Sequence, residues 1–356
     1  MTNSKSEMYR TMHGQPEQLR RLLEQGRDAA EEAASRLRDA RRIFLVGIGT
    51  SYHAALAGEW MLRSVGVDAR AVYSPDFADY AGAYPLRTDD GVIIMAHSGV
   101  KTTSSHALAR ALEAGASVVS VGSLTAEHPG SPLVLRTVER ETSAAFTASH
   151  TAAMFVLAQV ATRLAAGTDP ALATVYERAL EAIPDQVAEM LRREEEVAPV
   201  AYAAAGRLIY AAGAGPSAVS ALEAVIKVRE ASRAHIDGLP LEQFLHGPLV
   251  VVNREDYAVL INPPAATPAS TTRTAEIAGV LAHIGTPLWI AGEPVAQAPR
   301  ATVFSLPETP EPLSTILSVV PMQILANQIA DVLGANPDRF RRDDPVYAEA
   351  LGTLTL

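Results

Sequence analysis

The sequence contains one pattern twice, and this internal repeat constrains the fold more than any other feature. Each copy is a short apolar run, then Gly-x-Gly, then a hydroxyl residue two positions later. Gly47 and Ser51 of the first copy stand 166 positions before Gly213 and Ser217 of the second. A period this long indicates duplicated domains, because solenoid units are only ~20–50 residues long. The sequence therefore predicts two similar domains, and a site can form where they face each other.

Composition narrows the class of protein. The length of 356 residues suits about two domains of roughly 100–200 residues each. The net charge of −10 offers no broad basic surface to nucleic acid or anionic lipid. Cysteine is absent, which excludes disulfides, thiolate metal sites and a cysteine nucleophile. Residues 1–25 lack a signal-peptide core, and no apolar run approaches ~18 residues, so we expect a cytoplasmic protein without a membrane span.

Short apolar runs alternate with helical patterns along both halves of the chain. The strands predicted in the first half are Ile43–Val46, Ala69–Tyr73, Gly91–Met95, Ser117–Val121 and Leu133–Arg136. Those predicted in the second half are Leu208–Ala211, Ala258–Ile261 and Leu288–Ala291. This alternation predicts an α/β fold with parallel sheets that carry helices on both faces. Such sheets bind ligands beyond the carboxyl ends of their strands.

The helical patterns are of several kinds. Gln18–Arg42 is predicted to be one amphipathic lead helix, and Val175–Glu196 a charged connector that Pro184 breaks in two. The other predicted helices are Tyr52–Val65, a helix ending at Ala114, Ser149–Ala166, Ser217–Ser232, Thr271–Ile284 and Ser314–Leu333. Of these, Ser149–Ala166 and Ser314–Leu333 are the most apolar and are expected to be buried, the second with a kink at Pro321.

The first Gly-x-Gly loop is a candidate binding loop. Gly49, Thr50 and Ser51 leave a strand and enter a helix, where glycine permits close approach and unpaired N–H groups attract an anion. The same pattern also fits any tight turn between a strand and a helix. A dinucleotide fingerprint needs a third glycine, and Tyr52 stands there instead. A nucleotide-binding oxidoreductase is therefore the weaker interpretation, although Asp68 could supply its acidic residue.

The loop after the third predicted strand is a better candidate for binding an anion. Hydroxyl groups, backbone amides and one cation form a suitable phosphate cradle. The alternative is an ordinary solvated loop. In the second half, the matching loop contains Pro263 and Pro264, which lack N–H groups and cannot do the same. The candidate residues of the first-half loop are His97, Ser98, Gly99, Lys101, Thr102 and Thr103.

A third candidate element lies in the second half. Lys227 and Glu230 stand near the end of a helical pattern, and His246 follows sixteen residues after Glu230. A carboxylate and an imidazole can divide proton abstraction and proton donation between them. By spacing alone, Glu230 could equally form a surface salt bridge with Lys227, and His246 could be a structural histidine. The histidines form no i, i+4 pair, so no metal ligand set and no cofactor is predicted.

Together these elements resemble the proteins with two sugar isomerase (SIS) domains. The family includes the isomerase domain of glucosamine-6-phosphate synthase (glutamine–fructose-6-phosphate transaminase) and amino-sugar-phosphate deaminases and deglycases. The resemblance covers nearly the whole chain and implies two tandem SIS domains, each a parallel sheet flanked by helices in a flavodoxin-like αβα sandwich. It divides the chain into a lead segment (1–28), a first SIS domain (29–170), a helical connector (171–196), a second SIS domain (197–340) and a tail (341–356).

The resemblance also implies roles for the candidate residues. The loop of Gly49, Thr50 and Ser51 would touch the sugar or its phosphate, and Ser98, Gly99 and residues 101–103 would hold the phosphate. Lys227 and Glu230 would lie at the reacting carbons, with Glu230 as the base. His246 would assist ring opening or protonate a leaving group. In the family this histidine can act across a dimer interface, which implies a homodimer. Gln243 stands where the family often has an acid.

Three departures from the family pattern bear on the reaction. The chain has neither the glutaminase domain nor the cysteine nucleophile of the synthase, so we expect no nitrogen transfer from glutamine. The family's C-terminal Schiff-base lysine has no counterpart in Ala350–Leu356. In the phosphate loop, Ala96 replaces a serine, and Val100 and Lys101 replace the last pair of the motif. Lys101 could compensate by its charge.

The sequence therefore predicts an enzyme acting on a phosphorylated amino sugar or sugar–amine conjugate. Aldose–ketose isomerisation, deamination and deglycation remain open as the reaction. The alternative is a sensor that binds a sugar phosphate without chemistry, which the missing lysine and the altered loop would suit.

Overall fold

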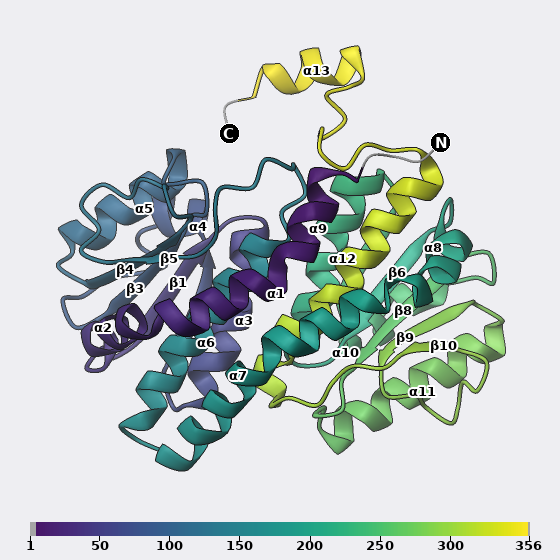
Figure 1. Cartoon of the computed structure of the whole chain (residues 1–356), viewed down its shortest axis with the longest axis horizontal. Coiled ribbons are helices and arrows are strands. Elements are labelled where there is room, and N and C mark those ends of the chain that lie inside the picture. Colours follow the sequence, from purple (N-terminus) through teal and green to yellow (C-terminus); the bar gives the residue numbers. More distant parts are fainter. Residues whose placement is uncertain (1–4, 355–356) are drawn as a thin grey trace. The chain divides into compact units, whose positions relative to one another are not determined.

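The computed structural model describes residues 5–354. It contains two compact units, called here the first and the second domain. The first domain consists of Gly14–Glu141 and Phe146–Pro184, and the second is formed mainly by Asp185–Thr353. Each contains one sheet with helices on its faces (Figure 1). The finer limits predicted for the lead segment, connector and tail stay predictions, and their outermost residues, 1–4 and 355–356, lie outside the described range.

Helices and strands alternate in both halves. The N-terminal half contains, in order, α1 (Glu7–Gln25), α2 (Arg27–Leu37), β1 (Ile43–Gly47), α3 (Thr50–Ser64), β2 (Ala69–Tyr73), α4 (Ser74–Asp79), β3 (Gly91–Met95), α5 (Thr102–Glu113), β4 (Ser117–Gly122), β5 (Val134–Arg136), α6 (Ala148–Ala166) and α7 (Pro170–Arg192). The C-terminal half contains α8 (Ala198–Ala204), β6 (Ile209–Gly213), α9 (Ser217–Ser232), β7 (Ile236–Pro240), α10 (Leu241–Leu245), β8 (Tyr257–Asn262), α11 (Pro268–Ile284), β9 (Leu288–Gly292), β10 (Thr302–Phe304), α12 (Ser314–Leu333) and α13 (Pro345–Gly352).

The two sheets have the same topology. The first has the order β2-β1-β3-β4-β5, and the second, read in the same direction, has the order β7-β6-β8-β9-β10. All neighbouring strands are parallel, and β1, β3, β6, β8 and β9 are buried at every residue. Burial on both faces explains their continuous apolar runs. The predicted fold class, a pair of parallel sheets flanked by helices, is confirmed.

The repeated glycines have a steric cause. A Cβ atom on Gly47 would lie 2.6 Å from the carbonyl oxygen of Ser51, and one on Gly213 would lie 2.5 Å from that of Ser217. In each domain the first turn of a helix therefore packs directly on the end of a strand, where only glycine fits. Two residues later in each copy, the second glycine adopts a positive φ, of 57° and 52° respectively.

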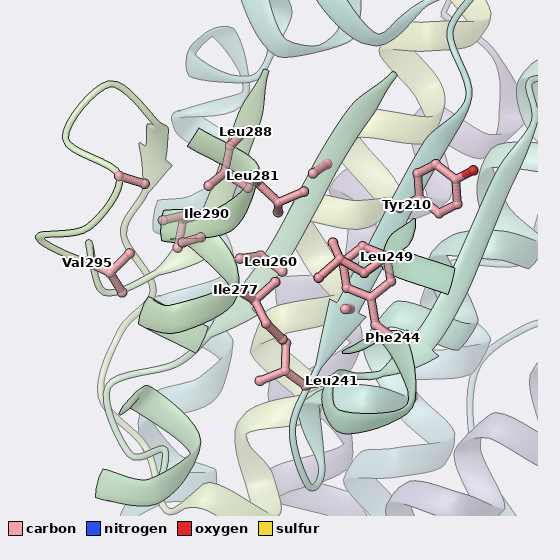
Figure 2. Packing of buried hydrophobic residues seen from close by; sticks show 14 of the residues in the cluster. Tyr210, Leu241, Phe244, Leu249, Leu260, Ile277, Leu281, Leu288, Ile290 and Val295 are labelled. Atoms are coloured by element: carbon pink, nitrogen blue, oxygen red, sulfur yellow. The ribbon is translucent and has the colours of Figure 1, made fainter. Parts of the chain in front are cut away.

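Each sheet packs helices on both faces. In the first domain, α4 and α5 cover one face of the sheet, and α2 and α3 contact its strands as well. In the second domain, one face packs against α10 and α11 through the cluster shown in Figure 2, in which Phe244, Leu260 and Ile277 are almost fully buried. The helices α9 and α12 pack against each other in the same domain and also contact its strands.

The helix α12 is long and apolar enough to cross a membrane by length and composition. Within the part of the chain that the structure describes, it is the one segment that meets this criterion, as Glu311–Leu333. Of its most apolar window, 78% is buried inside the structure. Buried core helices meet the same criterion, and the packing of α12 against α8 and α9 accounts for its composition.

Two helix predictions were wrong. In place of the predicted single lead helix there are two helices, α1 and α2, separated at Gly26. The first of them begins at Glu7, earlier than predicted. A Cβ atom on Gly26 would lie 2.6 Å from the carbonyl oxygen of Leu22 and 2.9 Å from Oε1 of Gln159, so this close approach requires glycine. The predicted break at Pro184 does not occur, because α7 continues through it. Ile183 and Val187 are fully buried on either side, and their burial offsets the ~3 kcal/mol cost of an internal proline.

Candidate functional site

A small cavity lies at the carboxyl ends of β1, β3 and β4 in the first domain. Its lining includes Thr50 and Ser51 after β1, Ala96 and His97 after β3, and Gly122 at the end of β4. Its volume is about 20 Å³, which is room for roughly one oxygen-sized group. The strand order reverses between β1 and β3, where open α/β sheets commonly bind ligands. The structure thus brings three predicted site residues together: Thr50, Ser51 and His97.

Part of the lining comes from residues that sequence analysis did not single out. Ser149 and His150 lie in the first turn of α6, and Phe146 lies two residues before that helix. The sequence predicted α6 only as a buried apolar helix. Its polar first turn, Ala-Ser-His-Thr, was the available signal that this end of the helix faces a site.

The loop of Ser98–Thr103 does not line this cavity, and much of its backbone is already engaged. The N–H of Gly99 donates to the carbonyl of Ala96 at 3.0 Å, and that of Val100 to the carbonyl of Glu127 at 3.0 Å. The N–H of Lys101 donates to Oγ of Ser104 at 2.8 Å. An anion at this loop would therefore meet hydroxyl groups and the first N–H groups of α5, with the exposed Lys101 ammonium beside them.

Gly99 holds the loop in shape. Its φ of +90° is unfavourable for other residues, and a Cβ atom there would lie 3.0 Å from the carbonyl oxygen of Glu127. The helix α5 begins at Thr102, so Thr102 and Thr103, which were predicted to lie in the loop, belong to its first turn.

His97 is held at the cavity by its neighbours. Its Nε2 accepts the backbone N–H of Glu141 at 3.4 Å, and its ring meets that of Phe146 edge to face, with centroids 5.3 Å apart. Burial lowers the pKa of His97, and the positive charge of Arg140 lowers it further, whereas the negative charge of Glu141 acts in the opposite direction. The imidazole is therefore biased toward its neutral form.

Glu141 is a buried carboxylate that the sequence analysis missed. Its oxygens accept the N–H of Ser149 at 2.7 Å, the N–H of Thr147 at 3.0 Å and the hydroxyl of Thr147 at 3.2 Å. It therefore caps the N-terminus of α6, where a negative charge is favourable. No local pattern could reveal this role, because Glu141 lies seven residues before the helix in an irregular segment.

The second domain carries a buried cluster of charges on α9. The Nζ atom of Lys227 lies 2.7 Å from Oε2 of Glu230 and 3.6 Å from Oε1 of Glu223. The side chains of Lys227 and Glu223 are 1% and 0% exposed, whereas that of Glu230 is 19% exposed. The predicted pair of Lys227 and Glu230 is thus present, but it is not a surface salt bridge. Glu223, one turn earlier on the same helix face, was missed although its i, i+4 spacing to Lys227 was a usable signal.

His246 lies at the end of α10 and is largely exposed. Its Nε2 lies 3.3 Å from Oε1 of Glu242, whose other oxygen lies 2.9 Å from Nε of Arg273. His246 is therefore not a buried structural histidine. A carboxylate accompanies it, although Gln243 stands at the position where the family often has the acid.

The second domain has no counterpart of the Ser/Thr-rich loop that follows β3. At the end of β8, Asn262 donates from Nδ2 to the carbonyl of Glu293 at 3.0 Å, and Pro263 and Pro264 follow. Within residues 5–354, no group of three or more His, Asp or Glu side chains is placed to hold a metal ion.

Comparison with known proteins identifies the first domain. Residues 36–163 match the family model of the SIS domain. This segment contains the whole first sheet and the cavity residues, and the match agrees with the resemblance that the sequence motifs indicated.

The relatives extend the similarity to nearly the whole chain. Glutamine–fructose-6-phosphate aminotransferase [isomerizing] of Aquifex aeolicus is 28% identical over 342 residues, which cover 94% of this chain and 56% of that protein. The chain thus spans little more than half of this relative. Among solved structures, the C-terminal domain of glucosamine-fructose-6-phosphate aminotransferase from Francisella tularensis aligns with a TM-score of 0.80 at 18% identity, covering 94% of this chain and 98% of that one. Glucosamine-6-phosphate deaminase from Thermotoga maritima aligns with a TM-score of 0.73 at 17% identity, covering 94% and 97%. At these low sequence identities, the two alignments show that the fold is shared.

Proposed function

We propose that this protein is an enzyme that processes a phosphorylated amino sugar or sugar–amine conjugate. It would move a proton between adjacent carbons of the open-chain sugar, with or without loss of the amine. The observation that carries this proposal is the carboxylate of Glu230, which is partly exposed and hydrogen-bonded to the buried ammonium of Lys227. The names of the related proteins, an isomerising aminotransferase and a glucosamine-6-phosphate deaminase, agree with this class of substrate.

The proposed chemistry assigns each group a step. Glu230 abstracts the acidic proton from the carbon that bears the nitrogen, next to the carbonyl carbon of the open-chain sugar, and returns it to that neighbouring carbon. His246 protonates the ring oxygen during ring opening, or the amine that leaves when water hydrolyses the resulting imine. Lys227 acts through Glu230, because its ammonium is almost completely buried and donates a hydrogen bond to that carboxylate. A Schiff base from Lys227 does not suit this burial, and the tail offers no lysine in its place.

The anionic group of the substrate is assigned to the first domain. The hydroxyl groups of Ser98, Thr102 and Thr103, with the ammonium of Lys101, supply donors and positive charge. The loop of Gly49, Thr50 and Ser51 is assigned to the sugar. That both domains act on one ligand is part of the proposal.

We further propose a cytoplasmic homodimer. Val250 and Val251 follow His246 closely and are 85% and 57% exposed. Such apolar exposure beside a proposed catalytic histidine supports a surface that a second copy covers.

Incubation of the purified protein with a panel of sugar phosphates, with and without ammonia, tests the function. The panel includes glucosamine 6-phosphate and fructose 6-phosphate, with the unphosphorylated sugars as matched controls. We expect conversion of at least one amino sugar phosphate and none of its unphosphorylated counterpart. Thermal stabilisation without turnover would instead indicate the sensor, and no effect of any phosphorylated sugar would refute the proposal.

A further inference from the structure

We propose that the first-domain cavity binds an uncharged oxygen of the sugar, a carbonyl or a hydroxyl, through a hydrogen bond donated by Nδ1 of His97. This inference rests on the proposed function and refines the assignment of His97, which the sequence grouped with the phosphate-binding residues.

The hydrogen bonds around His97 decide which nitrogen carries the proton. Because Nε2 accepts the backbone N–H of Glu141, a neutral ring must carry its proton on Nδ1. Nδ1 is buried and has no hydrogen-bond partner among the described residues, 5–354. A buried donor without a partner is unfavourable, and a ligand oxygen in the adjacent cavity would supply the missing acceptor.

The ring cannot easily turn to exchange the two nitrogens. Phe146 packs edge to face against it, and Phe146 and His97 both line the cavity. The position of the Glu141 N–H is in turn fixed, because the side chain of Glu141 is anchored on the first turn of α6. Glu141 is therefore a positioning residue for His97.

Charge disfavours the anionic group in this cavity. Its volume of about 20 Å³ has room for one oxygen-sized group. The carboxylate of Glu141 already occupies the N-terminus of α6 beside the cavity, which makes this position unfavourable for a second anionic group. The substrate class is consequently a sugar that offers both an anionic group, for the Lys101 loop, and a neutral oxygen, for His97.

Substitutions of His97 with different donor positions test the inference. In His97→Asn the amide nitrogen can take the place of Nδ1, whereas in His97→Gln it reaches the place of Nε2 instead. Binding of glucosamine 6-phosphate, measured by calorimetry, should weaken about tenfold in His97→Ala and His97→Gln, and less than threefold in His97→Asn. The exposed His106 provides the matched control, because His106→Asn makes the same chemical change outside the cavity.

Inorganic phosphate separates the two possible partners of His97. It carries the anionic group without the sugar oxygens, so its affinity should be the same in the wild type and in all His97 variants. A parallel loss of phosphate and sugar-phosphate affinity would show that His97 contacts the anion and would overturn the inference. Equal losses in the Asn and Gln variants would also overturn it.

Nitrogen NMR of the ligand-free protein gives a readout independent of the proposed function. At pH 7.5 we expect the neutral Nδ1–H tautomer for His97. An Nε2–H tautomer or an imidazolium would contradict the inference even if the protein binds sugar phosphates. Failure of the wild type to bind any sugar phosphate, with the Nδ1–H tautomer present, would refute the proposed function and with it the sugar as the cavity's ligand.

Discussion

Lys227 and Glu230 form a hydrogen-bonded ion pair on α9 in which the cation is buried and the anion reaches the surface. Nζ of Lys227 lies 2.7 Å from Oε2 of Glu230, and the two side chains are 1% and 19% exposed. In an ordinary surface pair both partners are solvated and contribute little. Here the carboxylate is partly exposed, whereas the cation that pairs with it is buried inside the protein.

Substitution of that carboxylate should stop the chemistry but not the binding. We expect Glu230→Gln to lower turnover of the sugar phosphate about 10²–10⁴-fold, because a positioned proton acceptor supplies that range. The amide keeps the shape of the side chain, so ligand-induced thermal stabilisation should persist. Turnover at the wild-type rate in this variant would remove Glu230 from the mechanism.

Loss of the buried cation should destabilise the fold. Lys227→Met leaves the carboxylates of Glu223 and Glu230 without the ammonium between them, and we expect unfolding free energy to fall by about 3–5 kcal/mol. Arg192→Met is the matched control, because Arg192 pairs with Glu189 at the surface and its loss should cost less than about 1 kcal/mol. Urea unfolding measures both, and equal effects would show that the Lys227 pair has no special weight.

The cap of α6 should contribute measurably to the stability of the first domain. Glu141→Ala removes the acceptor for two backbone N–H groups at the start of a buried helix, which we expect to cost about 2–3 kcal/mol. Asp344→Ala is the comparison, since Asp344 caps the exposed helix α13 through the N–H of Val346. Thermal unfolding should shift clearly for the first variant and little for the second. The reverse order would contradict the capping role.

Acid should destabilise the first domain through His128. Burial, with a smaller contribution from the charge of Arg136, lowers the pKa of His128 from 6.5 to about 4. The folded state therefore keeps this ring neutral, while the unfolded chain takes up a proton below about pH 6.5. The stability that depends on the neutral ring is fully present above pH 6.5 and is lost as pH falls toward 4.

The measurement compares stability at pH 8 and pH 5 in the wild type and in His128→Asn. We expect the loss between these pH values to be about 2 kcal/mol smaller in the variant. The carboxylates of the protein titrate in both proteins, so their contribution cancels in the comparison. An identical pH dependence would show that His128 does not titrate in this range.

Elements with a strong local pattern were predictable from the sequence. β2, β3, α9 and α12 have the predicted limits. β3 and α12 are continuous apolar runs that are buried along almost their whole length. β7 was missed because it is an edge strand with the sequence Ile-Asp-Gly-Leu-Pro, in which Ile236 is the one fully buried residue. β10 is likewise a short edge strand, of three residues.

The site was predictable only where its residues follow a strand directly. Thr50, Ser51 and His97 follow β1 and β3, and parallel strands bring their carboxyl ends to one edge of the sheet. Phe146 and His150 join them from a segment far along the chain, through tertiary packing that no local pattern encodes. Glu223 differs, because its spacing to Lys227 and Glu230 on one helix face could have revealed it.

The two prolines after β8 distinguish this loop from the equivalent loop after β3. Both sheets have the glycine on which the first turn of a helix packs against the end of a strand, and a Cβ atom at either glycine would clash. The loop after β8 has no such steric restraint, and Pro263 and Pro264 lack the amide donors that other residues would supply there. A binding loop engineered into that place would have to replace Pro263 and Pro264 first, while the scaffold beneath it is already shaped to carry one.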